Sequence, residues 1–240
     1  MEKIENNTGF LLIDKPLGWT SYDIIGYLRK ITGIRRIGHA GTLDPLASGL
    51  LIVAVGREAT RQIDNFMKMD KEYLAKIFLG KTTETYDREG KITSRYQGKK
   101  ITKKELLKKL EKFKGQIEQI PPMYSAKKIG GQKLYKLARQ GVEVKREPAK
   151  IEIKEIKVKK YAWPNIDLQI NCSSGTYIRS LANDLGAALG CGGYLKGLRR
   201  TKIGLFGIDE ATKIAKMTKD NYQKYLSRSG GIGRRASFRS

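Results

Sequence analysis

The sequence predicts an α+β fold with a mainly antiparallel sheet. Strand-like segments outnumber the simple β-α-β units that a parallel sheet requires. Hairpin-like pairs of strands also recur, most clearly in residues 151–161 and 166–172, which alternate apolar and polar side chains on either side of Trp163-Pro164-Asn165. Because no internal repeat or interdomain linker interrupts the pattern, we expect one domain over residues 1–226.

The aspartate that becomes important below lies between a predicted helix and a predicted strand. Ser21 can cap the helix, whose apolar residues recur at helical spacing until Gly33, where a C-terminal cap belongs. Residues 35–49 show no usable period and are predicted to be a loop, which ends at a buried strand over 50–55. Asp44 is therefore expected on a loop directly before a core strand.

The same patterns predict the remaining elements. Residues 101–114 form an amphipathic helix, in which Thr102 can cap the N-terminus and Glu105 completes a capping box. The apolar stripe of this helix consists of Leu106, Leu107, Leu110 and Phe113. Further helices are expected at 57–69, 134–140 and 176–189, strands at 10–13 and 72–79, a polar loop at 82–90, and a partly extended basic segment at 194–206.

A basic insertion and a polar tail complete the chain. The insertion opens at Pro121-Pro122, because neither proline can donate to a β-ladder, and it extends to about residue 150 with tyrosines among its lysines and arginines. After about Lys224 the apolar pattern ends. Residues 227–240 are rich in Arg, Gly and Ser and are expected to be disordered.

The charge of the chain predicts a polyanionic partner. Forty-eight lysines and arginines face 24 acidic residues, a formal net charge of +24. A field of this sign and size suits nucleic acid. The alternative is that the lysines only keep the protein soluble. An anionic membrane is a weaker candidate, because no basic amphipathic helix with an aromatic apolar face occurs.

Composition also restricts the chemistry. His39 is the only histidine, which excludes a zinc site built on a His cluster and a Ser-His-Asp triad. Cys172 and Cys191 lack the Cys-x-x-Cys spacing and are interpreted as reduced structural thiols. No apolar run could span a bilayer, and the N-terminal acids do not suit a signal peptide, so a cytoplasmic protein is expected.

A glycine-rich loop presents Asp44. In residues 38–49, Gly-His-Ala-Gly-Thr-Leu-Asp-Pro-Leu-Ala-Ser-Gly, three glycines allow close approach to another backbone, and Pro45 holds Asp44 out of the helical region. An Asp-Pro pair alone is more typical of a turn. Two further segments change this interpretation: Lys-Glu-Tyr-Leu-Ala at 71–75 and Cys-Ser-Ser-Gly-Thr-Tyr-Ile-Arg-Ser at 172–180.

Together with other segments, these closely resemble the bacterial tRNA pseudouridine synthases of the TruB type, which modify uridine 55 in the T loop. The resemblance runs in order from about residue 9 to about residue 210. The other segments are Asp14-Lys15-Pro16, residues 121–128 and Leu198-Arg199-Arg200. The resemblance implies the pseudouridine synthase fold, a central mixed sheet flanked by helices, with a basic, thumb-like insertion that closes on the RNA.

The resemblance assigns three residues to catalysis. Asp44 is the catalytic aspartate and the candidate nucleophile, Tyr73 stacks on the target base, and Arg179 pairs with Asp44. A carboxylate can attack carbon or stabilise developing positive charge, and a guanidinium beside it would lower its pKa and orient it. Attack on C6 of the base, attack on C1′ of the ribose and a glycal route all remain open; in the glycal route Tyr73 is the candidate base.

Six further residues are expected to bind the substrate. The target base must leave a folded T loop, at a cost of about a few kcal/mol, and in the family that the sequence resembles a histidine of the aspartate loop fills the space it leaves. The same resemblance implies that a tyrosine and a leucine line the pocket, and the lysines of the insertion are expected to contact phosphates. These residues are His39, Tyr177, Leu198, Lys15, Lys127 and Lys128.

Isomerisation adds and removes no atom overall, and the sequence carries no nucleotide, flavin or metal signature, so no cofactor and no metal are expected. The expected partner is the T arm of tRNA, bound by a monomer without an obligate protein partner. Bacterial relatives usually carry a small C-terminal RNA-binding module, which is expected to be absent here. Two alternatives remain: a non-catalytic RNA-binding or chaperone protein, and a pseudouridine synthase that depends on a guide RNA.

Overall fold

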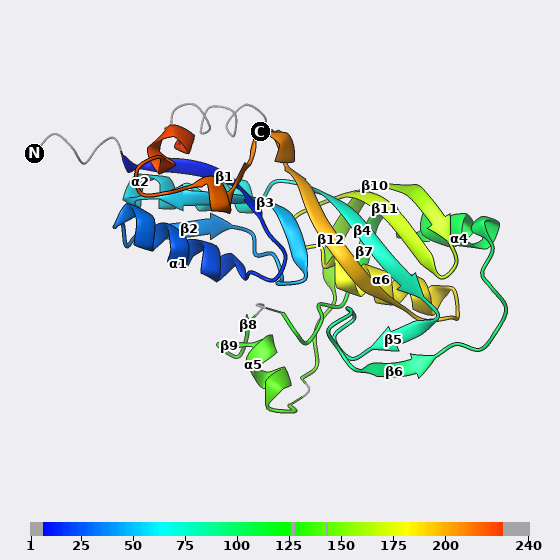
Figure 1. Cartoon of the computed structure of the whole chain (residues 1–240). Helices are drawn as coiled ribbons and strands as arrows, with labels where there is room; N and C mark the ends of the chain where they lie inside the picture. Colours follow the sequence, from blue (N-terminus) through cyan, green and yellow to red (C-terminus); the bar gives the residue numbers. More distant parts are fainter. Residues whose placement is uncertain (1–6, 126–127, 143, 228–240) are drawn as a thin grey trace, which may run out of the picture. The chain divides into compact units, whose positions relative to one another are not determined.

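The computed structural model describes residues 7–125, 128–142 and 144–227 (Figure 1). The chain divides into two compact units. The first comprises Met1–Tyr73 and Arg199–Ser240, and the second comprises Leu74–Leu198. Among the described helices, none combines the length and the apolar character that crossing a membrane requires.

The first unit is built on a mixed, mainly antiparallel sheet. In order across the sheet the strands are β14 (Thr212–Lys213), β1 (Gly9–Lys15), β3 (Ala47–Val55), β12 (Gly193–Ile203) and β4 (Lys71–Leu79). In addition, β2 (Ile37–Ala40) pairs with β3, and β13 (Phe206–Gly207) pairs with β12. Strands β1 and β3 pair antiparallel from Gly9 opposite Val55 to Lys15 opposite Gly49, whereas β1 and β14 are parallel. Both β4 and β12 contribute residues to each unit.

Helix α1 (Ser21–Thr32) closes one face of this sheet (Figure 1). Its buried residues Ile24, Ile25 and Leu28 pack with apolar side chains of β1 and β3 in one core cluster. The predicted C-terminal cap is confirmed, because Gly33 has a φ of 72° and donates its N–H to Arg29. The predicted N-terminal cap was wrong by one residue: Thr20 caps the helix and forms a capping box with Asp23.

Two other predictions in this unit need correction. Residues 35–49 are not loop throughout, because β2 lies within them and β3 begins three residues before the predicted strand. The single helix expected at 57–69 is two short helices, α2 (Arg57–Thr60) and α3 (Ile63–Met67). Short 3₁₀ turns follow β13, at Ile208–Glu210, Ile214–Lys216 and Tyr222–Tyr225. Of the predicted tail, Ser227 bridges to Phe10, and the other residues lie outside the described part of the chain.

In the second unit the strand order is β12, β4, β11, β10 and β7. The predicted hairpin is confirmed: β10 and β11 pair antiparallel around the turn at Trp163-Pro164, and β7 pairs antiparallel with the other edge of β10. The alternation predicted along β4 is also confirmed, with Tyr73, Ala75, Ile77 and Leu79 buried. The further elements of the sheet and its helices are β7 (Gly115–Gln119), β10 (Ala149–Ala162), β11 (Asn165–Cys172), α4 (Lys103–Leu110), the 3₁₀ turn Glu111–Phe113 and α6 (Ile178–Ala188).

Three predictions in the second unit are only partly correct. Thr102 and Glu105 form the expected capping box of α4, but Leu107 is 44% exposed and does not belong to its buried stripe. The polar loop at 82–90 begins inside a hairpin of β5 (Lys81–Thr83) and β6 (Ile92–Arg95). Helix α6 starts two residues later than predicted, with Tyr177 at its N-cap.

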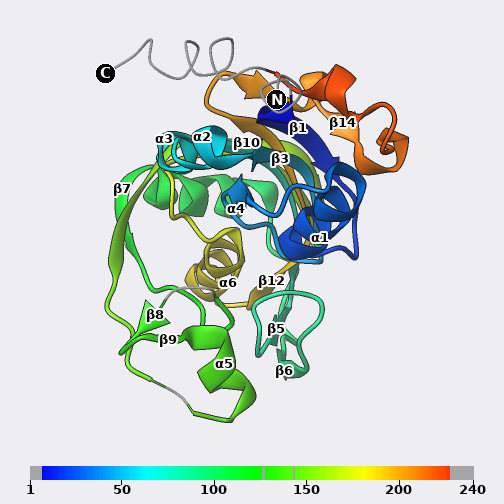
Figure 2. The ribbon, with the colours of Figure 1, turned by 90° about the vertical axis from the view of Figure 1, so that its left-hand side faces the viewer.

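The basic insertion forms a small substructure of its own. A short hairpin of β8 (Lys128–Ile129) and β9 (Gln132–Lys133) leads into α5 (Leu134–Arg139), which ends near Gly141, φ 73°, as predicted. Figures 1 and 2 both show these elements away from β10 and β11. The backbone N–H of Tyr135 donates to the carbonyl of Ser125, which ties α5 to the start of the insertion.

Candidate active site

Asp44 lies on the loop at residues 41–46, which joins β2 to β3 in the first unit. This confirms the predicted position before a core strand. The carbonyl oxygen of Asp44 accepts the N–H of Ala47 at 3.0 Å, so the turn at Asp44-Pro45 closes directly onto β3. Leu43 and Leu46 on either side are buried, while Asp44 is half-buried. Buried flanking side chains thus fix the backbone that presents the carboxylate.

Hydrogen bonds from the preceding segment hold the same loop. The hydroxyl of Ser21, the first residue of α1, accepts the N–H of Leu43 at 2.9 Å and donates to its carbonyl at 3.1 Å. The N–H of Gly18 donates to the carbonyl of Pro45 at 2.9 Å. Backbone groups on both sides of Asp44 are therefore satisfied by fixed partners, which favours a single loop conformation.

A buried arginine of β12 bonds to the start of the loop and to the strand that follows it. Arg200 is 1% exposed; its Nε donates to the carbonyl of Leu50 at 2.7 Å and its Nη2 donates to that of Gly41 at 3.0 Å. Gly49 has a φ of 108°, and a Cβ there would lie 2.2 Å from the carbonyl oxygen of Arg200. The close approach expected from the glycines of this segment is confirmed at Gly49.

Next to Arg200, a bidentate ion pair joins β12 to β1. The Nη1 and Nη2 atoms of Arg199 lie 3.0 and 2.9 Å from the two carboxylate oxygens of Asp14, and Nη1 also donates to Ser48 Oγ at 3.3 Å. Because this fork-to-fork geometry is directional, it sets the register of the strand ends from which the aspartate loop begins.

Lys15 places a positive charge beside Asp44. Its side chain is fully buried, and Nζ donates to the carbonyls of Pro16 at 2.9 Å and Trp19 at 2.6 Å. Burial lowers the pKa of Lys15 to about 8; the charge of Asp44 opposes this shift, and that of Arg200 adds to it. The ammonium therefore loses its proton in a pH range where a lysine in water stays charged.

His39 lies on β2, opposite Val53 of β3, two residues before the loop begins. Burial, and then the charge of Arg200, lower its pKa, so the imidazole is neutral near pH 7. Among the described residues its buried Nδ1 has no hydrogen-bond partner. A buried polar atom of this kind needs an explanation.

Tyr73 lies on β4, at the last residue of the first unit, and is 8% exposed. Its position on the buried face of β4 follows from the alternation of that strand. The structure thus places Asp44, Lys15, His39 and Tyr73 in the first unit, where Asp44 and Lys15 interact electrostatically.

In the second unit, buried Arg179 of α6 joins three segments. Its Nη2 donates to the carbonyl of Tyr124 at 2.6 Å, its Nη1 donates to that of Thr85 at 3.3 Å, and its Nη1 lies 3.5 Å from Asp87 Oδ2. Asp87 is held in turn by the hydroxyl of Thr85 at 2.7 Å and the N–H of Glu89 at 3.0 Å. This network orients the guanidinium and ties α6 to the start of the insertion.

The turn that carries Asp87 has unusual backbone geometry. Tyr86, with φ 62°, is the only residue other than glycine with a positive φ in the described ranges. A tyrosine in this region costs about 1–3 kcal/mol and persists only where its surroundings enforce it. The hydrogen bonds on either side supply that restraint: the N–H of Tyr86 donates to Thr83, and its carbonyl accepts the N–H of Leu195.

Gln119 fixes the backbone of Tyr177 at the N-terminus of α6. The amide oxygen of Gln119 accepts the N–H of Tyr177 at 2.8 Å, and its Nε2 donates to the carbonyl at 3.1 Å. Gln119 is 2% exposed at the end of β7. Ser180 adds a second tie, from its hydroxyl to the carbonyl of Ile120 at 2.9 Å. The start of α6, which carries Tyr177 and Arg179, is therefore held rigidly.

The remaining candidates are less defined. Leu198 is half-buried on β12. Lys127 lies outside the described residues, and the side chain of Lys128 is not described. The pairing of Arg179 with Asp44 would join residues of the two units and stays a prediction, as does the binding role of Lys15, whose described bonds are all to backbone carbonyls.

The sequence matches family models of known proteins along most of its length. Residues 29–178 match the model of the TruB family pseudouridylate synthase N-terminal domain, and residues 179–229 match the model of the tRNA pseudouridylate synthase B C-terminal domain. The chain belongs to the TruB family of pseudouridylate synthases. It is accordingly an isomerase with the pseudouridine synthase fold, as the resemblance implied.

Individual known proteins match over most of this chain. The chain is 48% identical to the tRNA pseudouridine synthase B of Chlamydia abortus, over 86% of this chain and 87% of the relative. It is 44% identical to the protein of the same name from Chlamydia trachomatis serovar L2, over 95% of each. A solved chain of a Cbf5-Nop10-Gar1 complex matches with a TM-score of 0.71 and 27% identity, over 96% of this chain and 58% of that one.

Four residues that hold candidate residues in place within their own units were not predicted to do so. Ser21 was interpreted as a helix cap, and Arg200 belonged to a segment of the resemblance without a role. Asp87 and Gln119 gave no signal, because both act through partners that are distant in the sequence. The sequence gives one indication for Arg200: it lies in a segment predicted to be partly extended, and a charged side chain that such a segment buries usually has a partner.

Proposed function

We propose that the chain isomerises uridine 55 in the T loop of tRNA to pseudouridine, with Asp44 as the nucleophile and without a cofactor. The observation that carries the proposal is the half-buried carboxylate of Asp44, on a loop tied by Ser21, Gly18 and Arg200, beside the buried ammonium of Lys15. The identity of 44–48% to proteins named tRNA pseudouridine synthase B supports tRNA as the substrate. The net charge of +24 suits this polyanion.

The reaction exchanges one bond of the base for another. The bond from uracil N1 to ribose C1′ breaks, a bond from C5 to C1′ forms, the C5 hydrogen leaves as a proton, and N1 gains one. Attack by the carboxylate on C6 or on C1′ creates an intermediate in which the base can turn. A rigid loop supports this role, because the carboxylate need not be reoriented for each attack.

The other candidates surround the base in this proposal. Arg179 pairs with Asp44, which would keep the carboxylate ionised; its orientation by Asp87 supports a positioning function. Tyr73 stacks on the uracil and is the candidate base in a glycal route. Tyr177 and Leu198 line the pocket, which the clamp of Gln119 on Tyr177 supports.

RNA binding requires that the target base leave the loop. His39 is proposed to fill the space, and its neutral imidazole can stack on neighbouring bases. Lys15, Lys127 and Lys128 are proposed to bind substrate, the two lysines of the insertion through phosphates. We propose that the enzyme acts as a monomer in the cytoplasm.

A tritium-release assay tests the proposal. An unmodified T-arm stem-loop carrying tritium at C5 of its uridines is incubated with the purified chain, without guide RNA or protein partners. Release of one equivalent of tritium from uridine 55 is expected, and a stem-loop with cytidine at that position should lose this release. Absence of release from both the stem-loop and full-length tRNA would refute it in favour of a non-catalytic RNA-binding protein. Activity that appears only with a guide RNA would support the guide-dependent alternative.

Lys15 predicts a pH limit for this reaction. Because its pKa is lowered to about 8, the positive charge beside Asp44 is present below that pH and lost above it. We expect kcat at saturating RNA to fall several-fold as the pH rises through about 8. Lys15→Met, similar in length but uncharged, should be slower near pH 7 and should lack this decline. A wild-type profile that stays flat between about pH 7 and about pH 9 would contradict this role.

A further inference from the structure

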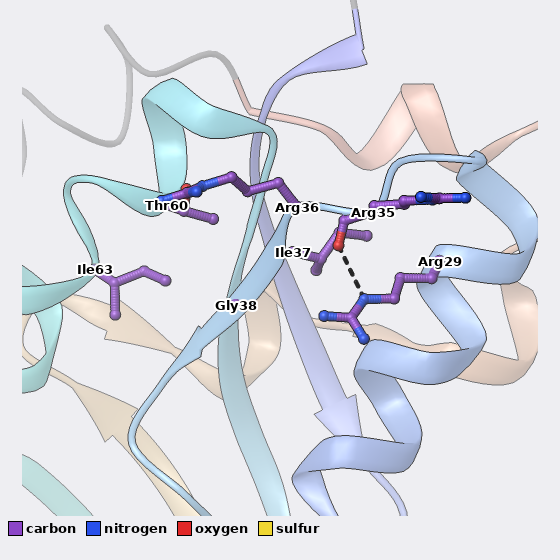
Figure 3. A pocket seen from close by; sticks show the side chains of 7 residues that line it. All are labelled: Arg29, Arg35, Arg36, Ile37, Gly38, Thr60 and Ile63. Carbon is purple, nitrogen blue, oxygen red and sulfur yellow. Dashed lines mark hydrogen bonds between the residues drawn. The ribbon is translucent and has the colours of Figure 1, made fainter.

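An open pocket on the first unit lies between α1, β2 and the helices α2 and α3. Its volume is about 480 Å³, within the range of about 300–1,000 Å³ typical of ligand sites. The pocket is lined by Arg29, Arg35, Arg36, Ile37, Gly38, Thr60 and Ile63 (Figure 3). It contains none of the residues assigned above to catalysis or substrate binding.

Two arginines of this pocket are held in fixed orientations through Nε. Arg29 Nε donates to the carbonyl of Arg35 at 3.0 Å, and Arg36 Nε donates to Thr60 Oγ1 at 3.2 Å. Figure 3 shows Arg29 reaching in from α1, while Arg36 runs from the start of β2 toward Thr60. Since each bond uses Nε, no hydrogen bond among the described residues engages the Nη groups of either arginine, although the guanidinium carbon of Arg29 lies 5.8 Å from the ring centroid of Tyr22. A pre-oriented guanidinium fork matches the oxygens of a phosphate group.

The positive charge of the pocket is not neutralised by the protein. Within the ranges that the structure describes, Arg29, Arg35 and Arg36 form no ion pair with a carboxylate. Arg29 and Arg36 place two guanidinium groups at one pocket, and an anion relieves the repulsion between their charges. The pocket therefore favours a ligand that carries negative charge and oxygen acceptors.

The location relates the pocket to the aspartate loop. Pocket residues Ile37 and Gly38 begin β2, and the loop follows the last residue of this strand. At about 3.3 Å per residue, the four residues of β2 span roughly 13 Å. A few nucleotides of RNA backbone bridge this distance, so an RNA whose target base reaches Asp44 can place a phosphate at the arginines.

We propose that this pocket binds a backbone phosphate of the RNA substrate through Arg29 and Arg36. The inference rests on the proposed function for the identity of the RNA. It adds a contact on the first unit, separate from the basic insertion. The occupant is a phosphodiester group, and its binding is independent of the base sequence.

Binding measurements with single variants test the pocket. Arg29→Ala and Arg36→Ala should each weaken binding of an unmodified T-arm stem-loop roughly tenfold and reduce the salt slope of log affinity by about 1, because one phosphate contact is lost. Arg61→Ala is the matched control, since this exposed arginine follows Thr60 but does not line the pocket. Arg36→Lys should restore only part of the affinity, because it keeps the charge but loses the fork.

Competition with inorganic phosphate tests whether the pocket binds a phosphodiester of the RNA backbone or a free phosphate ion. At equal ionic strength, phosphate should weaken RNA binding to the wild type more than chloride does, and Arg36→Ala should abolish this difference. Phosphate competition without any loss of RNA affinity in the variants would make the pocket a free-anion site and overturn the proposal. Variants that match Arg61→Ala in affinity and slope would overturn it even if the wild type releases tritium. If the variants bind RNA more weakly than the wild type but the wild type releases no tritium, the proposed function is refuted and the phosphate site is supported.

Discussion

Asp44→Asn is expected to lower tritium release from uridine 55 by at least about 10³-fold while the fold and the affinity for tRNA remain unchanged. The amide has nearly the size of the carboxylate, but it lacks the negative charge needed to attack carbon or to stabilise an oxocarbenium-like centre. The loop should keep its shape, because its described anchors at Leu43, Pro45 and Ala47 are backbone bonds. Release rates under single-turnover conditions and filter binding measure the two quantities separately.

Asp64→Asn provides the matched control for this change. Asp64 lies exposed on α3 in the same unit, so the variant loses the same charge without touching the loop. Its release rate should equal that of the wild type. If Asp44→Asn retained activity within about tenfold, another group would have to perform the attack, and the interpretation of the glycine-rich loop would be wrong.

Helix α1 shows how far local patterns predict this fold. The apolar spacing and the glycine at its end were sufficient to predict the body of the helix and its C-terminal cap. Thr20 and Ser21 are adjacent residues that can both cap a helix, and local preference does not separate them. The tertiary structure decides between them: Ser21 faces the loop and bonds to Leu43, which leaves Thr20 to form the capping box.

Short elements were missed for a different reason. Strand β2 has four residues, two of them buried, which is too short for an alternating pattern to appear. The apparent helix at 57–69 breaks at Arg61-Gln62, where neither proline nor glycine marks an end. Strand β2 is stabilised by its pairing with β3, and the helices α2 and α3 both pack against β2.

The candidate site also contains residues that local sequence predicts and residues that only the tertiary structure reveals. Its catalytic candidates, Asp44, Tyr73 and Arg179, come from local segments of the sequence that resemble a family motif, and their roles stay predictions. The residues that hold them could not be predicted, since Arg200 bonds to Gly41 and Leu50 from 159 and 150 residues away. A motif therefore predicts which groups react, whereas the groups that restrain them follow only from the paired strands.

Gly49→Ala is expected to destabilise the first unit strongly. A positive φ costs a non-glycine residue about 1–3 kcal/mol, and a Cβ at 2.2 Å from the carbonyl oxygen of Arg200 and 2.7 Å from its nitrogen forces β3 and β12 apart. Overpacking adds about 1–3 kcal/mol, so the total loss is about 2–6 kcal/mol. For a chain of this size the melting temperature should fall by at least roughly 4 °C, measured by calorimetry.

Gly26→Ala is the matched control, because the same substitution is expected to stabilise the chain at this position. Gly26 lies on the exposed side of α1 with nothing within 4 Å of a built Cβ, so alanine should stabilise the helix by about 0.5–1 kcal/mol. A Gly49→Ala protein that melts with the wild type would show that β3 and β12 do not approach so closely. Separation of these strands also displaces the Arg200 bonds to Gly41 and Leu50, so Gly49→Ala should lower the release rate even at temperatures where the chain remains folded.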